Sequence, residues 1–104
     1  DAGETVRQSA EREVREELGY ALDLSGVRPS VTVNYHGGFD DYFLVVRELD
    51  IETLVLQKEE VTAVRWASQE EVLCMIREDL FIGYPESFIQ FLFDMREQFG
   101  FVMK

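Results

Sequence analysis

Three glutamates, Glu13, Glu16 and Glu17, follow one another at spacings of three and four residues. Residues at these spacings are neighbours on a helix, so a helix here would gather the three carboxylates in one small patch. Like charges held this close raise the energy of the fold unless a cation or a proton lies between them. Carboxylate oxygens are the ligands that Mg²⁺ and Mn²⁺ prefer. The spacing therefore predicts a divalent-metal site on these residues.

The surrounding segment carries the signals of the helix that would hold this patch. Thr5 and Gln8 match a capping box at its start. Gly19 supplies the left-handed residue that commonly ends a helix. Between these ends, apolar side chains recur every four residues, and we expect them to face a core. They are Val6, Ala10, Val14 and Leu18.

The position of each acid relative to this apolar stripe decides between two interpretations. An acid-rich helix is usually a solvated face, and we expect Glu11 and Arg15 to lie on that face. Glu13 and Glu17 fall beside or within the stripe instead, at the edge of a surface expected to be buried. An unpaired carboxylate at such an edge is costly. The pattern therefore favours a functional role for these glutamates.

The same segment resembles the signature of the Nudix hydrolases. Seven residues separate Glu4 from the run Arg12-Glu13-Val14-Arg15-Glu16-Glu17-Leu18-Gly19. Tyr20 stands where the signature has an aliphatic residue, and its ring can pack in the same place. The leading glycine of the signature would fall before Asp1, so we expect an N-terminally truncated domain. Residues 1–104 are interpreted as the C-terminal two thirds of a single Nudix domain, with the signature at residues 4–20.

The resemblance implies a reaction and a set of roles. Nudix hydrolases cleave a nucleoside diphosphate linked to another moiety, by attack of water on phosphorus. Glu16 and Glu17 would bind Mg²⁺ or Mn²⁺, and Glu13 would serve as a further ligand or as the general base. Arg12 would orient Glu16 through a charge-assisted hydrogen bond. Glu4 would tie the loop to the helix or help to bind the metal at longer range.

Members of this family commonly use a further acid after the signature, and three residues are candidates. Asp41 opens an apolar run, whereas Glu59 and Glu60 precede Val61. Both settings are similar to those in isopentenyl diphosphate isomerases, which share the Nudix fold. The alternatives are a turn-forming role for Asp41 and a solvated acidic loop for Glu59 and Glu60.

Patterns after the signature predict an α/β fold. Gly26–Tyr35 and Asp41–Leu49 are expected to be strands joined by an antiparallel hairpin, the second strand being buried on both faces. Residues 61–66 are a weaker strand prediction, and Trp66 is expected in the core. The remaining signals predict two helices: a capping box at Ser68 and Glu71, then Pro85 before an apolar stripe that Gly100 ends. The stripe consists of Phe88, Phe91, Leu92, Met95 and Phe99.

Strands covered by helices on both faces form an α/β/α sandwich. The resemblance implies the same architecture, with a mixed sheet that lacks its first strand or strands. Exposed sheet edges in such a domain would favour association into a homodimer. Without the missing segment, we expect this fragment alone to be weakly active or inactive.

The composition of the chain limits the classes of partner that it is expected to bind. The net charge is −11, with 10 Lys and Arg against 21 Asp and Glu, which argues against binding to duplex nucleic acid. A small diphosphate substrate remains compatible, because bound cations reverse the local sign. No apolar run is long enough to cross a bilayer, so no membrane partner is expected. Cys74 is the single cysteine, which is compatible with a reducing cytoplasm.

Two other functions remain open at this point. The first is an isomerase of the isopentenyl diphosphate type, suggested by the settings of Asp41 and of Glu59 and Glu60. The second is a non-catalytic Nudix module that senses a nucleotide. The complete set of signature glutamates argues against the second, because binding alone would not require all of them.

Overall fold

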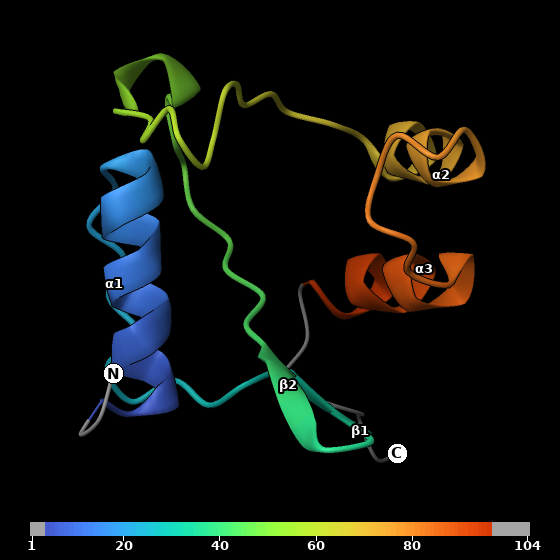
Figure 1. Ribbon diagram of the computed structural model, residues 1–104, viewed down its shortest axis with the longest axis horizontal. Coiled ribbons are helices and arrows are strands. Elements are labelled where there is room, and N and C mark those ends of the chain that lie inside the picture. Colours follow the sequence, from blue (N-terminus) through green and yellow to red (C-terminus); the bar gives the residue numbers. More distant parts are fainter. Residues whose placement is uncertain (1–3, 97–104) are drawn as a thin grey trace. The chain divides into compact units, whose positions relative to one another are not determined.

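The computed structural model describes residues 4–96. The chain forms two compact units, Asp1–Phe43 with Arg47–Arg65, and Leu44–Val46 with Trp66–Lys104. Figure 1 shows the elements in chain order. They are α1 (Val6–Leu18), β1 (Val31–Tyr35), β2 (Gly38–Tyr42), a 3₁₀ turn η1 (Ile51–Thr53), α2 (Gln69–Arg77) and α3 (Glu86–Met95).

Helix α1 has the start and the end that the sequence predicts. The Gln8 backbone N–H donates to Thr5 Oγ1 at 3.1 Å, and the Thr5 N–H donates to Gln8 Oε1 at 3.0 Å. Gly19 has φ 66°, and its N–H donates to the carbonyl of Arg15 at 2.9 Å. The capping box and the left-handed glycine are therefore confirmed.

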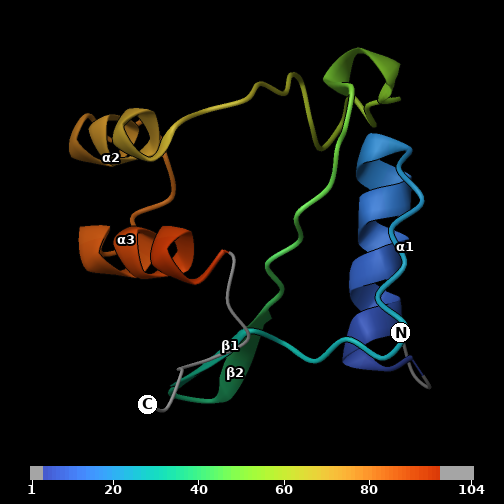
Figure 2. The same cartoon turned by 180° about the vertical axis from the view of Figure 1, so that it is seen from behind.

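The connection after α1 turns back along the helix, as Figure 2 shows. Leu24, the most buried side chain of the described residues at 1% exposure, lies in this connection. Its backbone N–H donates to Glu11 Oε2 at 2.6 Å. The prediction that Glu11 lies on the solvated face was wrong, because its carboxylate satisfies the backbone of the returning chain.

The apolar stripe of α1 is less buried than predicted. No residue of the helix is fully buried, and Val6 is 47% exposed. Ala10, Val14 and Leu18 are half-buried. The core expected against this helix is therefore thin within the described residues.

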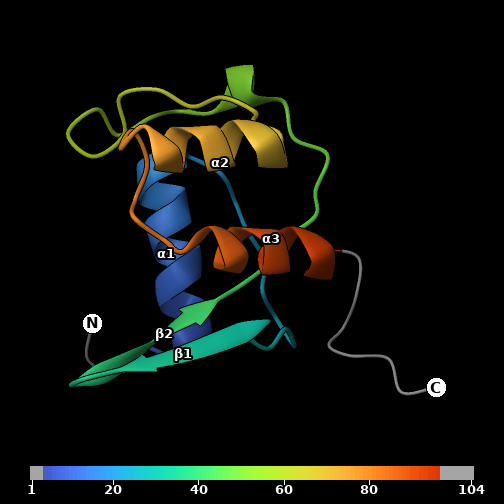
Figure 3. The same ribbon diagram turned by 90° about the vertical axis from the view of Figure 1, so that its right-hand side faces the viewer.

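Strands β1 and β2 form the predicted antiparallel hairpin (Figure 3). Their register pairs Val31 with Tyr42 and ends with Tyr35 opposite Gly38. His36 and Gly37 form the two-residue turn, in which Gly37 has φ 97°. A positive φ is what such a tight hairpin turn requires, and glycine adopts it without strain.

The predicted strands are longer than the observed ones. Of Gly26–Tyr35 only Val31–Tyr35 is a strand, and Asp41–Leu49 contributes only the last two residues of β2. The Ser30 N–H still donates to the Tyr42 carbonyl at 2.8 Å. The expectation of a long strand buried on both faces was wrong, as Val46 at 66% exposure also shows.

In the second unit, α2 and α3 pack on each other (Figures 1 and 3). Ser68 and Glu71 form the predicted capping box, with bonds of 3.2 Å and 2.9 Å. Among the described residues of this unit, the buried side chains are Leu73, Ile89 and Met95. An ion pair between Arg77 Nη2 and Glu86 Oε1 at 2.8 Å joins the two helices. This contact lowers the pKa of Glu86.

Two further expectations concern aromatic residues. Phe88, Phe91 and Leu92 are half-buried, in agreement with the predicted stripe of α3, and Phe99 and Gly100 lie outside the described residues. Trp66 is 62% exposed, so its predicted place in the core was wrong. It lies in an extended stretch, residues 61–66, that forms no strand.

The fold is α/β, with three α-helices and one small antiparallel sheet in the described residues. None of these helices is both long enough and apolar enough to span a membrane.

Candidate active site

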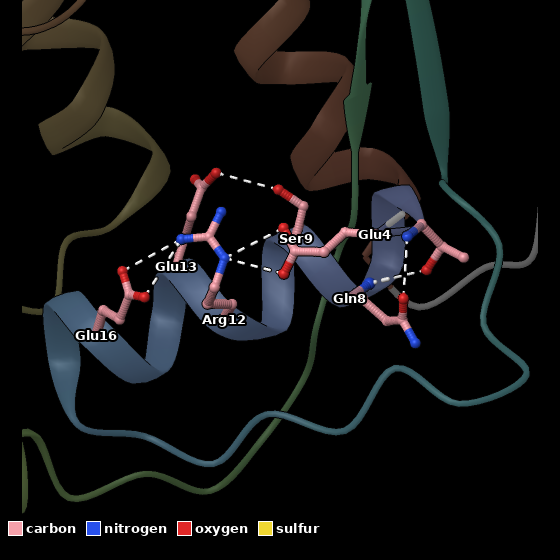
Figure 4. Close-up of polar contacts among 7 residues, drawn as sticks. Glu4, Gln8, Ser9, Arg12, Glu13 and Glu16 are labelled. Carbon is pink, nitrogen blue, oxygen red and sulfur yellow. Dashed lines mark hydrogen bonds and ion pairs between the residues drawn. The ribbon is translucent and has the colours of Figure 1, made fainter. Parts of the chain in front are cut away.

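Arg12 holds two signature glutamates at once. Its Nε donates to both carboxylate oxygens of Glu4, at 3.0 and 3.2 Å, and its Nη1 donates to those of Glu16, at 3.2 and 3.3 Å. Figure 4 shows the guanidinium between the two carboxylates. The bond from Arg12 lowers the pKa of Glu4, and the two carboxylates raise the pKa of Arg12. The expected bond from Arg12 to Glu16 is present, and the positioning role of Arg12 stays a prediction.

Glu13 and Glu17 have different surroundings. Glu13 is exposed, and its Oε1 accepts a hydrogen bond from Ser9 Oγ at 3.3 Å (Figure 4). Its predicted place at the edge of a buried surface was wrong, since its side chain is exposed. Glu17 is half-buried, as expected. Its backbone carbonyl accepts the N–H of Gln57 at 2.9 Å.

The three predicted metal ligands share one helix but do not converge. Glu13 is turned to Ser9, whereas Glu16 is turned to Arg12. Within residues 4–96, no group of three or more His, Cys, Asp or Glu side chains is arranged to hold a metal ion. The backbone therefore places these carboxylates within one turn, and the side chains of Glu13 and Glu16 are bound to protein donors.

Asp41 lies near the signature helix. A depression of about 470 Å³, here called the acidic depression, separates the first half of α1 from the hairpin. Asp41 is half-buried and accepts a hydrogen bond from the Thr32 hydroxyl, its cross-strand partner. The lining residues are Glu4, Thr5, Val6, Ser9, Ala10, Glu13, Phe39, Asp40, Asp41 and Phe43.

Asp40 lines the same depression, although the sequence patterns did not predict it. It is exposed and lies opposite Val33 in the sheet register. The available signal was its place beside Asp41 in an Asp-Asp pair. The expectation that a buried strand begins at Asp41 left Asp40 outside the predicted strand and outside the predicted site.

Glu59 and Glu60 do not lie near Asp41. They belong to a turn that backbone hydrogen bonds join to the end of α1. Val55 and Gln57 donate their N–H groups to the carbonyls of Leu18 and Glu17, both at 2.9 Å. The N–H of Glu60 then donates to the Gln57 carbonyl at 2.9 Å. Both glutamates are exposed, and neither lines the acidic depression. The structure thus ties their turn to the Glu17 end of the helix, away from Asp41.

Comparison with known proteins gives the family. The family model of the NUDIX domain matches residues 1–90. An uncharacterized Nudix hydrolase of Listeria monocytogenes, lmo0368, is 42% identical over 94 residues, which cover 90% of this chain and 54% of that protein. The uncharacterized Nudix hydrolase lin0387 of Listeria innocua is 40% identical over 94 residues, with the same coverage. The chain thus spans about half the length of these curated relatives.

No solved structure matches the chain. The family match covers the capped helix, the contacts of Arg12 with Glu4 and Glu16, and the hairpin with Asp40 and Asp41. The signature residues Glu4 to Tyr20 and this match over most of the sequence lead to one conclusion: the chain belongs to the Nudix hydrolase family.

Proposed function

We propose that the protein containing this chain hydrolyses a diphosphate bond in a nucleoside diphosphate linked to another moiety, by attack of water on phosphorus. The observation that carries the proposal is the signature on α1: Glu13, Glu16 and Glu17 within one turn, with Arg12 bound to Glu16. Membership of the Nudix family supports the same reaction.

The donor set fits a divalent cation. The three carboxylates supply hard oxygen ligands, which suit Mg²⁺ or Mn²⁺. Glu13 and Glu16 are exposed, and Glu17 is half-buried, so their side chains have room to change rotamer. A bound ion would neutralise phosphate oxygens and lower the pKa of a coordinated water. Glu16 and Glu17 are the proposed ligands, and Glu13 is either a third ligand or the general base.

Arg12 and Glu4 position one of these carboxylates, that of Glu16. Arg12 limits the rotation of Glu16, and Glu4 in turn fixes Arg12 through two bonds to Nε. Glu16 would exchange part of its contact with Arg12 for a ligand contact, whereas Glu4 keeps the guanidinium in place. Asp40 and Asp41 line the depression that Glu13 also lines, and they are the proposed further acids of the site.

We propose, for the complete domain, the α/β/α sandwich with a mixed sheet that is typical of the resemblance. The two-stranded hairpin would be part of that sheet. This part of the proposal is tested by a solved structure of the full-length protein.

The experiment measures product release by the full-length protein from a panel of diphosphate compounds: nucleoside triphosphates, dinucleotides, nucleotide sugars and isoprenoid diphosphates. Each reaction is run with Mg²⁺, with Mn²⁺ and with EDTA. Reactions in ¹⁸O-labelled water identify the attacked atom, because attack on phosphorus places the label in a phosphate product. We expect labelled phosphate, and no reaction in EDTA.

The matched variants are Glu16→Gln/Glu17→Gln and, as a control that removes the same charge from exposed positions, Glu48→Gln/Glu52→Gln. We expect hydrolysis to be lost in the first variant and kept in the second. Metal-independent hydrolysis, or isomerisation of isopentenyl diphosphate without release of a phosphate product, would contradict the proposal.

A further inference from the structure

Ser9 lies one helical turn before Glu13 on α1. Its hydroxyl donates to Glu13 Oε1 at 3.3 Å, as Figure 4 shows. Ser9 is half-buried, Glu13 is exposed, and both line the acidic depression. Within residues 4–96, this hydroxyl is the hydrogen-bond partner of the Glu13 carboxylate. The orientation of that carboxylate therefore depends on Ser9.

The Ser9 hydroxyl is used differently from most serine hydroxyls inside a helix. Such a hydroxyl usually faces solvent or donates back to the carbonyl four residues earlier. The Ser9 backbone N–H makes the ordinary helical bond to the Thr5 carbonyl at 2.9 Å, whereas the hydroxyl donates forward to Glu13. Serine has a lower helix propensity than alanine, so the helix itself gains no stability from a serine here. The contribution of the hydroxyl is its contact with Glu13.

The bond acts in the same direction as the geometry of the helix. Long side chains on a helix lean toward its N-terminus, so Glu13 lies over the turn that carries Ser9. The neighbours of Glu13 on the following turn are Glu16 and Glu17, which carry the same charge. A donor at Ser9 therefore favours the orientation in which Glu13 lines the acidic depression and stays apart from Glu16.

Ser9 differs from Arg12 in the kind of donor that it provides. Arg12 is a cation and forms ion pairs with Glu4 and Glu16. A hydroxyl orients a carboxylate through one hydrogen bond and adds no positive charge. Within residues 4–96, Glu13 forms no ion pair, so its negative charge is available to a cation or to the proton of a water.

The hairpin side of the acidic depression has a similar contact. Asp41 accepts a hydrogen bond from the hydroxyl of Thr32, its cross-strand partner. An acid on α1 and an acid on β2 thus line one depression, and each has a neutral hydroxyl donor. Both carboxylates are oriented without being neutralised.

We propose that Ser9 is a positioning residue, whose hydroxyl directs the Glu13 carboxylate toward the acidic depression for the reaction. The inference rests on the proposed hydrolase function, in which Glu13 is a third ligand or the general base. Ser9 contacts neither the substrate nor the cation and acts through Glu13. It lies among the seven residues that separate Glu4 from Arg12, outside the fixed positions of the signature.

The first experiment measures the orientation of Glu13 in the metal-free full-length protein, from the three-bond NMR couplings between its Hα and Hβ atoms. We expect one dominant side-chain rotamer in the wild type and an average over several rotamers in Ser9→Ala. Ser9→Thr keeps a hydroxyl donor and should restore the dominant rotamer. Ser87→Ala, which removes an exposed serine from α3, is the control and should leave these couplings unchanged.

The second experiment measures kcat and KM at saturating Mg²⁺ with the best compound of the diphosphate panel. In Ser9→Ala, kcat should fall by about three- to tenfold, the loss expected for one neutral hydrogen bond. KM should change little, and Ser9→Thr should restore kcat. In a Glu13→Ala background, Ser9→Ala should cause no further loss of kcat, because the carboxylate through which it acts is gone.

Unchanged couplings or a wild-type kcat in Ser9→Ala would overturn the inference. An equal loss of kcat from Ser9→Ala with and without Glu13→Ala would also overturn it, because that loss would come from the fold. The coupling measurement requires no turnover, so it separates this inference from the hydrolase proposal. If Ser9→Ala alters the couplings but the full-length protein hydrolyses no compound, the orientation of Glu13 by Ser9 is supported and the hydrolase proposal fails.

Discussion

Gly19 is the residue at which the signature helix meets the loop that follows η1. Its φ of 66° is left-handed, and a β-carbon at this position would lie 2.9 Å from the β-carbon of Val55. The chain comes this close because Val55 donates its N–H to the Leu18 carbonyl. Two separate constraints therefore favour glycine at this position: the left-handed backbone conformation and the short distance to Val55.

The two reasons can be separated by mutation. Gly19→Ala should lower the free energy of unfolding by roughly 1–2 kcal/mol, because alanine is strained in the left-handed conformation. The loss should be larger still, because Val55 must move. Gly26→Ala is the control, since Gly26 has φ 72° but a β-carbon added there would meet nothing within 4 Å. Urea unfolding of both variants measures the difference. Equal losses in stability would show that the Val55 contact is unimportant.

The stability that the contact between Arg12 and Glu4 gives to the folded state depends on pH. The direction of this dependence follows from the pKa of Glu4. Arg12 lowers the pKa of Glu4 below its ordinary value of 4.5. A carboxylate with a lowered pKa stabilises the folded state above the unfolded-state pKa, and this stabilisation disappears as the pH falls through the folded-state pKa. Arg12→Gln should therefore be less stable than the wild type at pH 7, with a difference that shrinks below about pH 4.5.

Unfolding free energies measured from pH 7 to pH 3 check this prediction. Arg15→Gln removes the same charge from an exposed site and should show no comparable pH-dependent difference. If the Arg12→Gln difference stayed constant down to pH 3, the bond to Glu4 would not contribute to stability.

At the scale of elements, local chemistry made the helix ends predictable from the sequence. Thr5 with Gln8, and Ser68 with Glu71, act over three residues, so no distant partner is needed to recognise them. The hairpin turn at His36 and Gly37 is equally local. The ends of the strands were not predictable in this way, because a ladder depends on both of its segments, and here it pairs only Val31–Tyr35 with Gly38–Tyr42.

The side-chain contacts at the site also divide into local ones, which the sequence predicts, and distant ones, which it does not. The i, i+3, i+4 spacing correctly predicted that Arg12 lies beside Glu16, since a helix alone decides it. The link between Glu11 and Leu24 and the neighbourhood of Asp40 depend on how the chain returns to α1. Periodicity carries no information about such a return, so these contacts were missed.

The cap of α2 provides a test at this scale. Ser68→Ala removes the oxygen that accepts the Glu71 N–H and should destabilise the protein by about 1 kcal/mol. Ser87→Ala, an exposed serine in the first turn of α3, should be neutral or slightly stabilising, because alanine has the higher helix propensity. Urea unfolding followed by circular dichroism compares the two. A loss in Ser87→Ala as large as that in Ser68→Ala would contradict the capping role.

At the scale of the whole molecule, the net charge of −11 opposes the binding of a diphosphate, which is itself an anion. A cation on α1 would reverse the sign of the charge where the substrate binds. The sequence alone predicted the family and the acids of the signature. The bond from Arg7 to the Val27 carbonyl could not be predicted, because the two residues are 20 positions apart in the sequence.

The central claim is that Glu16 and Glu17 bind the cation that hydrolysis requires. The most direct measurement is the initial rate of diphosphate hydrolysis by the full-length protein as Mg²⁺ is titrated, for the wild type, Glu16→Gln/Glu17→Gln and the control Glu48→Gln/Glu52→Gln. We predict saturation in Mg²⁺ for the wild type and the control, and a loss of rate of about a hundredfold or more in Glu16→Gln/Glu17→Gln. A wild-type rate in Glu16→Gln/Glu17→Gln, with the same dependence on Mg²⁺, would contradict this claim.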